Sequence, residues 1–127
     1  MPTILILDDD AADTVLIHRI ATDAKYSVLT SQNLEEFRRE LARQPIDLVM
    51  ISLATISEKD IPRLQHILLQ SPDTKVLVVA PAQRRAGLTT LLRAESLQAQ
   101  HLLAKPIEPQ QILTILDRTV PRPTPQE

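Results

Sequence analysis

Two spacings of apolar residues alternate along the 127 residues of this chain. Short runs of apolar or β-branched residues have the length of buried strands, and they lie at residues 3–7, 27–30, 48–51, 76–80 and 102–104. Between and after these runs, apolar residues recur every three to four positions, as on one face of a helix, at residues 11–24, 33–43, 60–70, 84–95 and 108–119. We therefore expect five consecutive strand–helix units.

Each expected helix carries a stripe of apolar residues. The positions are Ala12, Leu16, Ile20 and Ala24 in the first helix, Leu34, Phe37 and Leu41 in the second, Ile61, Leu64, Ile67 and Leu68 in the third, Leu88, Leu91 and Leu92 in the fourth, and Ile112, Leu113 and Leu116 in the fifth. Asp10 is expected to cap the first helix, because a side-chain oxygen there can accept a free backbone amide. Prolines 62 and 109 suit first turns.

The short connections between the units imply parallel strands joined by right-handed crossovers. Periodicity alone does not give the strand order. At this size the natural candidate is the flavodoxin-like doubly wound α/β fold, a five-stranded parallel sheet in the order 2-1-3-4-5 with helices on both faces. We assign residues 1–120 to one domain, and residues 121–127, with their alternating prolines, to an extended tail or a linker to a C-terminal output domain.

Composition narrows the classes of protein. Hydrophobic residues make up 43% of the chain but aromatic residues only 2%, so the core must be aliphatic. A net charge of −2 argues against direct nucleic-acid binding, which needs a concentrated basic surface. The absence of cysteine excludes disulfides, thiolate metal sites and cysteine nucleophiles. No apolar run reaches the roughly 18 residues of a membrane span, and we expect a cytoplasmic protein with no membrane partner.

Residues that could bind a ligand or take part in chemistry stand where the expected strands end. Asp8 and Asp9 follow the first strand, Ser52 the third, Ala80 the fourth and Lys105 the fifth. Open α/β sheets bind ligands at the carboxyl ends of their strands. Paired carboxylates are common ligands of Mg²⁺, and a nearby lysine can act as a point charge on a phosphate. The sequence therefore indicates a phosphate-handling site whose third strand lacks a carboxylate.

With these motifs the chain resembles the receiver domain of bacterial two-component response regulators over nearly all of residues 3–119. The resemblance rests on residues 4–10, 46–51, 77–80 and 102–106. It implies that Asp8 and Asp9 hold Mg²⁺ and that Lys105, followed by Pro106, contacts a phosphoryl group. It also implies three degenerate positions, which are Ser52 at the phosphoacceptor, Ala80 at the hydroxyl sensor and Leu102 at the aromatic switch.

These departures predict a divergent receiver, or pseudo-receiver, that cannot undergo aspartyl phosphorylation. A neutral hydroxyl does not attack a phosphoryl donor as a carboxylate does, and the methyl group of Ala80 cannot sense a phosphoryl oxygen. We expect no enzymatic activity and no required cofactor, with weak Mg²⁺ binding by Asp8 and Asp9 at most. The segment 53–60 also lacks the Met-Pro and Gly that are common in the family at this place.

Such a module would act through a protein partner, an attached output domain or a second copy of itself. In the family, the surface of the fourth helix, fifth strand and fifth helix commonly mediates dimers. Here it would carry Leu88, Leu91, Arg93, Glu95, Gln111 and Arg118. The alternative is a receiver-like switch controlled by cation binding or by phosphorylation of Ser52.

Simpler interpretations of the same residues remain. Asp8, Asp9 and Lys105 can form a remnant charge cluster in which the ammonium offsets carboxylate repulsion. Ser52 can be a small polar filler. A nucleophilic pair of Ser52 and Lys105, or a small autonomous enzyme, is disfavoured because the sequence offers no oxyanion hole and the loops are too short for a deep pocket.

Overall fold

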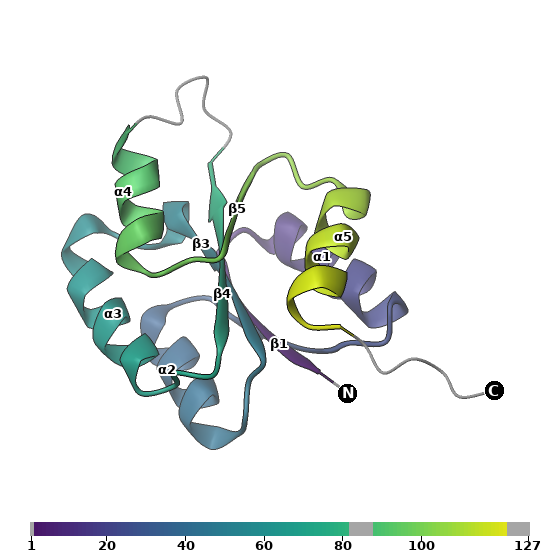
Figure 1. Ribbon diagram of the computed structural model, residues 1–127, viewed down its shortest axis with the longest axis horizontal. Coiled ribbons are helices and arrows are strands. Elements are labelled where there is room, and N and C mark those ends of the chain that lie inside the picture. Colours follow the sequence, from purple (N-terminus) through teal and green to yellow (C-terminus); the bar gives the residue numbers. More distant parts are fainter. Residues whose placement is uncertain (1, 82–87, 122–127) are drawn as a thin grey trace.

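Five strands alternate with five helices in the computed structural model, which describes residues 2–81 and 88–121 (Figure 1). The strands are β1 (Thr3–Leu7), β2 (Ser27–Ser31), β3 (Leu48–Ser52), β4 (Lys75–Ala80) and β5 (His101–Ala104). The helices are α1 (Ala11–Asp23), α2 (Leu34–Arg43), α3 (Ile61–Leu69), α4 (Leu88–Ser96) and α5 (Pro109–Thr119), with two short 3₁₀ turns, η1 (Leu53–Thr55) and η2 (Glu58–Asp60), after β3.

The predicted boundaries agree closely with the observed ones. Every predicted strand ends within one residue of an observed strand, and the same holds for four of the helices. The fourth helix was expected from residue 84, and α4 is described from Leu88, so residues 84–87 lie outside the described part of the chain. Of the expected tail, residues 122–127 lie outside it as well.

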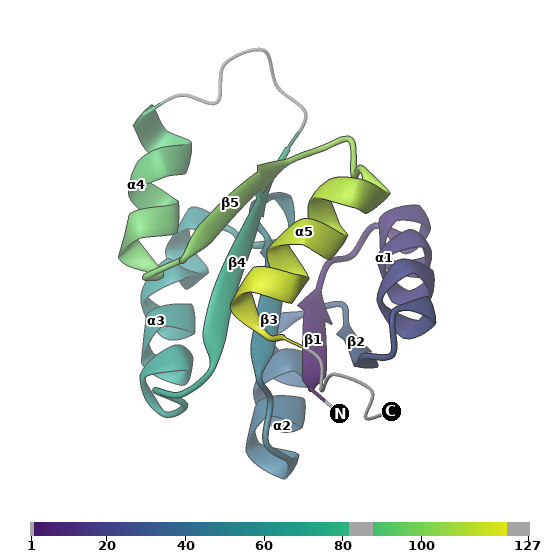
Figure 2. The ribbon, with the colours of Figure 1, turned by 45° about the vertical axis from the view of Figure 1, so that its right-hand side comes forward.

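The strands form one parallel sheet in the order β2-β1-β3-β4-β5, as predicted. Helices α1 and α5 cover one face, and α2, α3 and α4 cover the other (Figures 1 and 2). Side chains alternate between the two faces along each strand, so that in β3 Val49 and Ile51 pack against α2 and α3 while Leu48 and Met50 pack under α1 and α5. Because both faces of the sheet are covered, the inner strands β1, β3 and β4 are apolar almost without alternation.

The predicted inward stripe of α1 is wrong in part. The helix buries Ile17 and Ala21, whereas Ala12 and Leu16 are exposed. Positions four residues apart advance by about 40° around a helix of 3.6 residues per turn, so a stripe started at Ala12 turns steadily toward the core and reaches it only near its end. The predicted Asp10 cap is confirmed, since its carboxylate accepts a hydrogen bond of 3.0 Å from the amide of Asp13.

The apolar residues of α4 also differ from the expected inward set. Ala94 and Leu97 are buried, while Leu91 and Leu92 are both about half exposed and the side chain of Leu88 lies outside the described part. Among the side chains of α4 that the structure describes, the small Ala94 is the buried one, and Leu97 is buried directly after the helix. Two leucines are left on its outer side.

The end of α5 is anchored to the start of β2. The hydroxyl of the buried Tyr26 donates to the carbonyl of Val120 over 2.9 Å and contacts the carboxylate of Asp117 at 3.2 Å. This contact fixes the position of Val120, the residue that follows α5. Among the described residues, no helix has the length and hydropathy needed to cross a membrane.

Candidate functional site

The carboxyl ends of the central strands bring the predicted site residues to one end of the sheet. Asp8 follows β1 and is only 3% exposed, and Ser52 ends β3 and is only 2% exposed. Leu7 is paired with Ile51, so Asp8 and Ser52 are the next positions along neighbouring strands. Ala80 ends β4 opposite Ala104, which places Lys105 directly beyond that pair. The ends of the strands therefore bring together residues up to 97 positions apart in the sequence.

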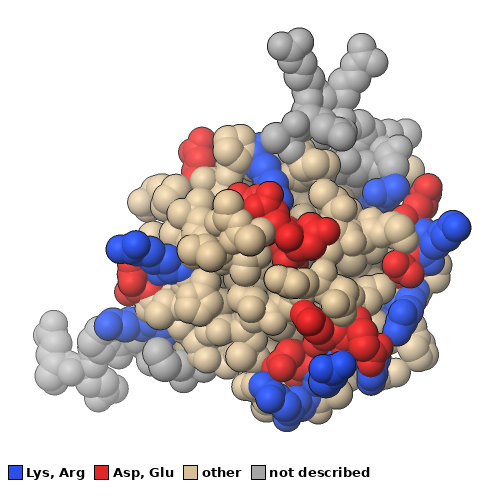
Figure 3. All heavy atoms as spheres, turned by 180° about the vertical axis from the view of Figure 1, so that it is seen from behind, with Lys and Arg blue, Asp and Glu red and all other residues tan. Residues whose placement is uncertain are grey.

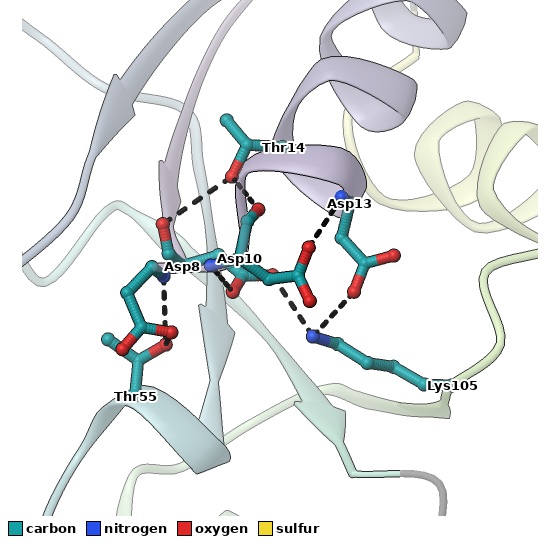
Figure 4. Close-up of polar contacts among 7 residues, drawn as sticks. Asp8, Asp10, Asp13, Thr14, Thr55 and Lys105 are labelled. Carbon is teal, nitrogen blue, oxygen red and sulfur yellow. Dashed lines mark hydrogen bonds and ion pairs between the residues drawn. The ribbon is translucent and has the colours of Figure 1, made fainter.

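Lys105 bridges two carboxylates. Its Nζ lies 2.7 Å from Oδ2 of Asp13, in the first turn of α1, and 3.3 Å from Oδ2 of Asp8 (Figure 4). The other oxygen of Asp8, Oδ1, accepts the backbone amide of Asp10 over 2.9 Å. Both oxygens of the buried Asp8 carboxylate thus have partners, and the end of β5 is tied to the start of α1.

The environment of Lys105 favours its charged form. Partial burial by itself lowers the pKa of the ammonium, because removal from water penalises the charge. The hydrogen bond with Asp13 and the negative charges of Asp8 and Asp13 act in the opposite direction and outweigh it, so the pKa of Lys105 is raised above its ordinary value. Lys105 is therefore a permanent cation at neutral pH.

Asp9 is paired with Thr55, a residue of the turn that follows β3. The backbone amide of Asp9 donates to Oγ1 of Thr55 over 3.0 Å, and the Thr55 hydroxyl donates back to Oδ1 of Asp9 over 3.1 Å. Figure 4 shows Thr55 on the opposite side of the acidic loop from Lys105. This reciprocal pair joins η1 to the loop between β1 and α1.

The three positions that the sequence predicts to be degenerate differ in their surroundings. The hydroxyl of Ser52 is buried and has no hydrogen-bond partner among the described residues. Ala80 is buried as well, and Leu102 is exposed on the edge strand β5. Lys105 is joined to Pro106 by a cis peptide bond. None of the side chains of Ser52, Ala80 and Leu102 contributes a charge to the site.

The residues at this site do not fit a magnesium ion in the observed arrangement. Mg²⁺ requires oxygen ligands in near-octahedral geometry and usually takes one or two carboxylates. Here Asp8 is engaged by Lys105 and a backbone amide, Asp9 is engaged by Thr55, and Ser52 supplies no negative charge. Within residues 2–81 and 88–121, no three Asp, Glu, His or Cys side chains are grouped so that they could hold an ion.

Two residues of the site were missed in the sequence. Asp13 could have been found from the sequence. It lies three positions after the helix cap, in the first turn of α1, and therefore at the same end of the sheet as Asp8. Nothing in the sequence points to Thr55, because it is 46 positions from Asp9 and reaches it only through the turn η1.

The residues expected to form an interaction surface are arranged unevenly. Leu91 is 54% exposed, and Glu95, Gln111 and Arg118 are exposed as well. Arg93 is only partly exposed, and its Nη2 lies 3.9 Å from Oε1 of Glu58 in η2, toward the neighbouring helix α3. The side chain of Leu88 lies outside the described part.

A groove of about 380 Å³ opens at the other end of the sheet. It lies between the ends of α3 and α4 and the start of β4, and its lining includes Leu69, Pro72 and Gln98 but no charged side chain. It is therefore separate from the site around Asp8 and Lys105.

Comparison with known proteins gives the family. The sequence model described as the response regulator receiver domain matches residues 4–117. A curated relative, the DNA-binding transcriptional regulator NtrC of Rhizobium meliloti (strain 1021), is 30% identical over 121 residues, which are 95% of this chain but only 24% of that protein. The chain thus spans about a quarter of its curated relative.

Solved structures agree on the fold. A response regulator from Thermotoga maritima superposes with a TM-score of 0.82 at 20% identity, covering 94% of this chain and 98% of the other. The chemotaxis protein CheY4 of Vibrio cholerae superposes with a TM-score of 0.82 at 19% identity, covering 94% and 99%. With the family match over residues 4–117, this chain belongs to the response regulator receiver domain family.

Proposed function

We propose that this receiver domain is a pseudo-receiver, a signalling module that works without aspartyl phosphorylation. The observation that carries the proposal is Ser52, a buried and uncharged residue at the end of β3, the position at which the family's phosphoacceptor aspartate is expected. An acyl phosphate forms when a carboxylate oxygen attacks the phosphorus of a donor. A neutral serine hydroxyl is a much weaker nucleophile unless a neighbouring base takes its proton, and Lys105, held as a cation, is not such a base.

The other departures support the same function. A hydroxyl at the end of β4 could respond to a phosphoryl oxygen by hydrogen bonding, but Ala80 has only a methyl group. Leu102 has no aromatic ring to move between a buried and an exposed position. In this proposal the domain thus lacks a residue that accepts a phosphoryl group, a hydroxyl that senses it and an aromatic side chain that moves in response.

The phosphorylation test follows directly. Incubation with acetyl phosphate or phosphoramidate in Mg²⁺ is expected to leave the intact mass of the protein unchanged, because no carboxylate ends β3. A receiver with aspartate at that position, treated in parallel, should gain one phosphoryl group that hydroxylamine removes. A hydroxylamine-sensitive phosphoryl group on this chain would refute the proposal.

Phosphorylation of Ser52 is the second candidate and has less support. The side chain is 2% exposed, so a kinase would have to open the end of the sheet to reach it. The same mass measurement, made on protein from its native cells, separates the two functions, since a phosphoserine ester survives hydroxylamine. Control by a cation is also less supported, because the carboxylates of Asp8 and Asp9 already have partners.

In this proposal the domain signals through protein contacts. Receiver domains act on partners or on output domains, and the surface proposed here is made by α4, β5 and α5, which lie side by side in Figure 2. It presents the exposed leucines 91 and 102 among the polar residues Glu95, Gln111 and Arg118. Apolar side chains within a polar rim are typical of protein interfaces.

An attached output domain after residue 121 fits the anchoring of α5 by Tyr26, which fixes the position of Val120. The remaining three quarters of the curated relative leave room for such a domain in a longer protein. Direct nucleic-acid contact by the receiver itself is not proposed. On the face seen in Figure 3, Lys and Arg are interspersed with Asp and Glu, and no broad basic patch is visible there.

A dimer through this surface has a defined test. Leu91→Glu is expected to weaken self-association by about tenfold or more, because burying a carboxylate in the interface costs at least about 1.4 kcal/mol. Leu69→Glu on α3, 69% exposed and outside this surface, is the control and should leave association unchanged. Sedimentation velocity over a concentration series measures both. If the wild-type protein is monomeric throughout and no partner protects α4 and α5 from amide exchange, the proposed surface is wrong.

A further inference from the structure

We infer that Lys105 is the built-in cation of this receiver. Its ammonium replaces a divalent ion, and together with the pair formed by Asp9 and Thr55 it holds the loops of the site in one arrangement. This inference rests on the proposed function, because a site that accepts no phosphoryl group has no need to exchange its cation. It concerns the regulation of the site rather than its chemistry.

The buried carboxylate of Asp8 requires a balancing charge. Asp8 is only 3% exposed, and a carboxylate removed from water needs compensation by a charge or by several hydrogen bonds. Lys105 supplies one positive charge, which lies 3.3 Å from Asp8 and is shared with Asp13 at 2.7 Å. The ammonium is covalently attached to the chain, so it cannot diffuse away as a metal ion can. One negative charge at the acidic end of the sheet is therefore balanced in every molecule.

Carboxylate oxygens of Asp8 and Asp9 already have partners within the chain. Asp8 uses one oxygen for Lys105 and the other for the amide of Asp10, and Asp9 uses Oδ1 for the hydroxyl of Thr55. A divalent ion that entered here would compete with Lys105 for Oδ2 of Asp8 and with Thr55 for Oδ1 of Asp9. Entry therefore carries a cost that a site of unpaired carboxylates does not have.

The side chains of Lys105 and Thr55 also connect the loops of the site. The contacts of Lys105 tie the end of β5 to the start of α1, and Thr55 ties the turn after β3 to the loop after β1 (Figure 4). Three of the loops at this end of the sheet are thus joined by side chains of the chain itself. The arrangement needs neither a phosphoryl group nor a metal, so a change of state would have to come from a bound partner.

The test compares Lys105→Met with Lys59→Met. Both variants lose one positive charge, but Lys59 is exposed and has no ion pair among the described residues. We expect Lys105→Met to lower the melting temperature by about 5 °C in metal-free buffer, and Mg²⁺ to restore most of this loss because it takes the vacated place. The wild type and Lys59→Met should show no change with Mg²⁺. Equal stabilisation of all three by Mg²⁺, or no difference between the two variants, would overturn the inference.

A second measurement remains informative even if Lys105→Met fails to fold. The chain has four lysines, and reductive methylation followed by mass spectrometry reports the reactivity of each. Lys105 should react several-fold more slowly than the exposed Lys25, Lys59 and Lys75, and Asp13→Asn should remove most of that protection. Equal reactivity of the four in the wild type would contradict the inference. The phosphorylation test has a different readout, so failure of the proposed function is distinguishable from failure of this inference.

Discussion

Replacing Ser52 with aspartate is expected to lower the free energy of unfolding by about 3 kcal/mol at neutral pH in metal-free buffer. Ser52 is buried, and the pairing of Leu7 with Ile51 puts it beside Asp8 on the neighbouring strand. The variant would place a second carboxylate in a part of the sheet end that has one ammonium, Lys105, already shared between Asp8 and Asp13. Like charges at this depth disfavour the folded state.

Urea unfolding, followed by circular dichroism with and without Mg²⁺, measures this effect. Ser52→Asn is the matched control because it has nearly the shape of aspartate without the charge. Mg²⁺ should recover part of the stability of Ser52→Asp and none in Ser52→Asn. Equal stability of the two variants in metal-free buffer would show that the site tolerates another negative charge. The argument from charge balance would then be wrong.

Replacing Phe37 with alanine is expected to lower the free energy of unfolding by about 3–5 kcal/mol, through lost burial and the cavity that remains. Phe37 is the only phenylalanine of the chain and is completely buried on α2, in the cluster between the sheet and helices α2, α3 and α4. The rest of that cluster is aliphatic, so no neighbouring aromatic ring can fill the space.

The same unfolding measurement checks this prediction. Leu69→Ala on α3 is the control, since its side chain is 69% exposed and its removal should cost less than about 0.5 kcal/mol. A loss below about 1 kcal/mol for Phe37→Ala would mean that α2 can collapse onto the sheet. The packing of this layer would then be less rigid than the burial of Phe37 indicates.

The elements of the fold were accessible from the sequence because a parallel sheet covered on both faces needs continuous apolar strands. The runs 3–7 and 48–51 have that character, and the helices between them have a different period. The orientation of α1 was less accessible. Its apolar residues occupy more than half of the helix surface, so the pattern alone did not distinguish the buried Ile17 and Ala21 from the exposed Leu16.

Some residues of the candidate site could likewise be predicted from the sequence, and others could not. Asp8, Ser52 and Lys105 were found because every strand of a parallel sheet ends at the same edge, so the ends of apolar runs identify neighbours without any coordinates. The partners of these residues were not found in this way. Asp13 meets Lys105 because the side chain that follows β5 reaches the first turn of α1, and Thr55 meets Asp9 because η1 lies beside the loop after β1.

The sequence by itself determined the order of the elements, the aliphatic core and the residues at the strand ends, because these depend on hydrophobic period and residue type, which are local properties. Only the tertiary structure decided that the acidic residues already have partners within the chain. A hydrogen bond between residues 46 positions apart, such as that of Asp9 with Thr55, depends on how loops close over the sheet. Loop closure is set by packing across the whole domain and leaves no periodic trace in the sequence.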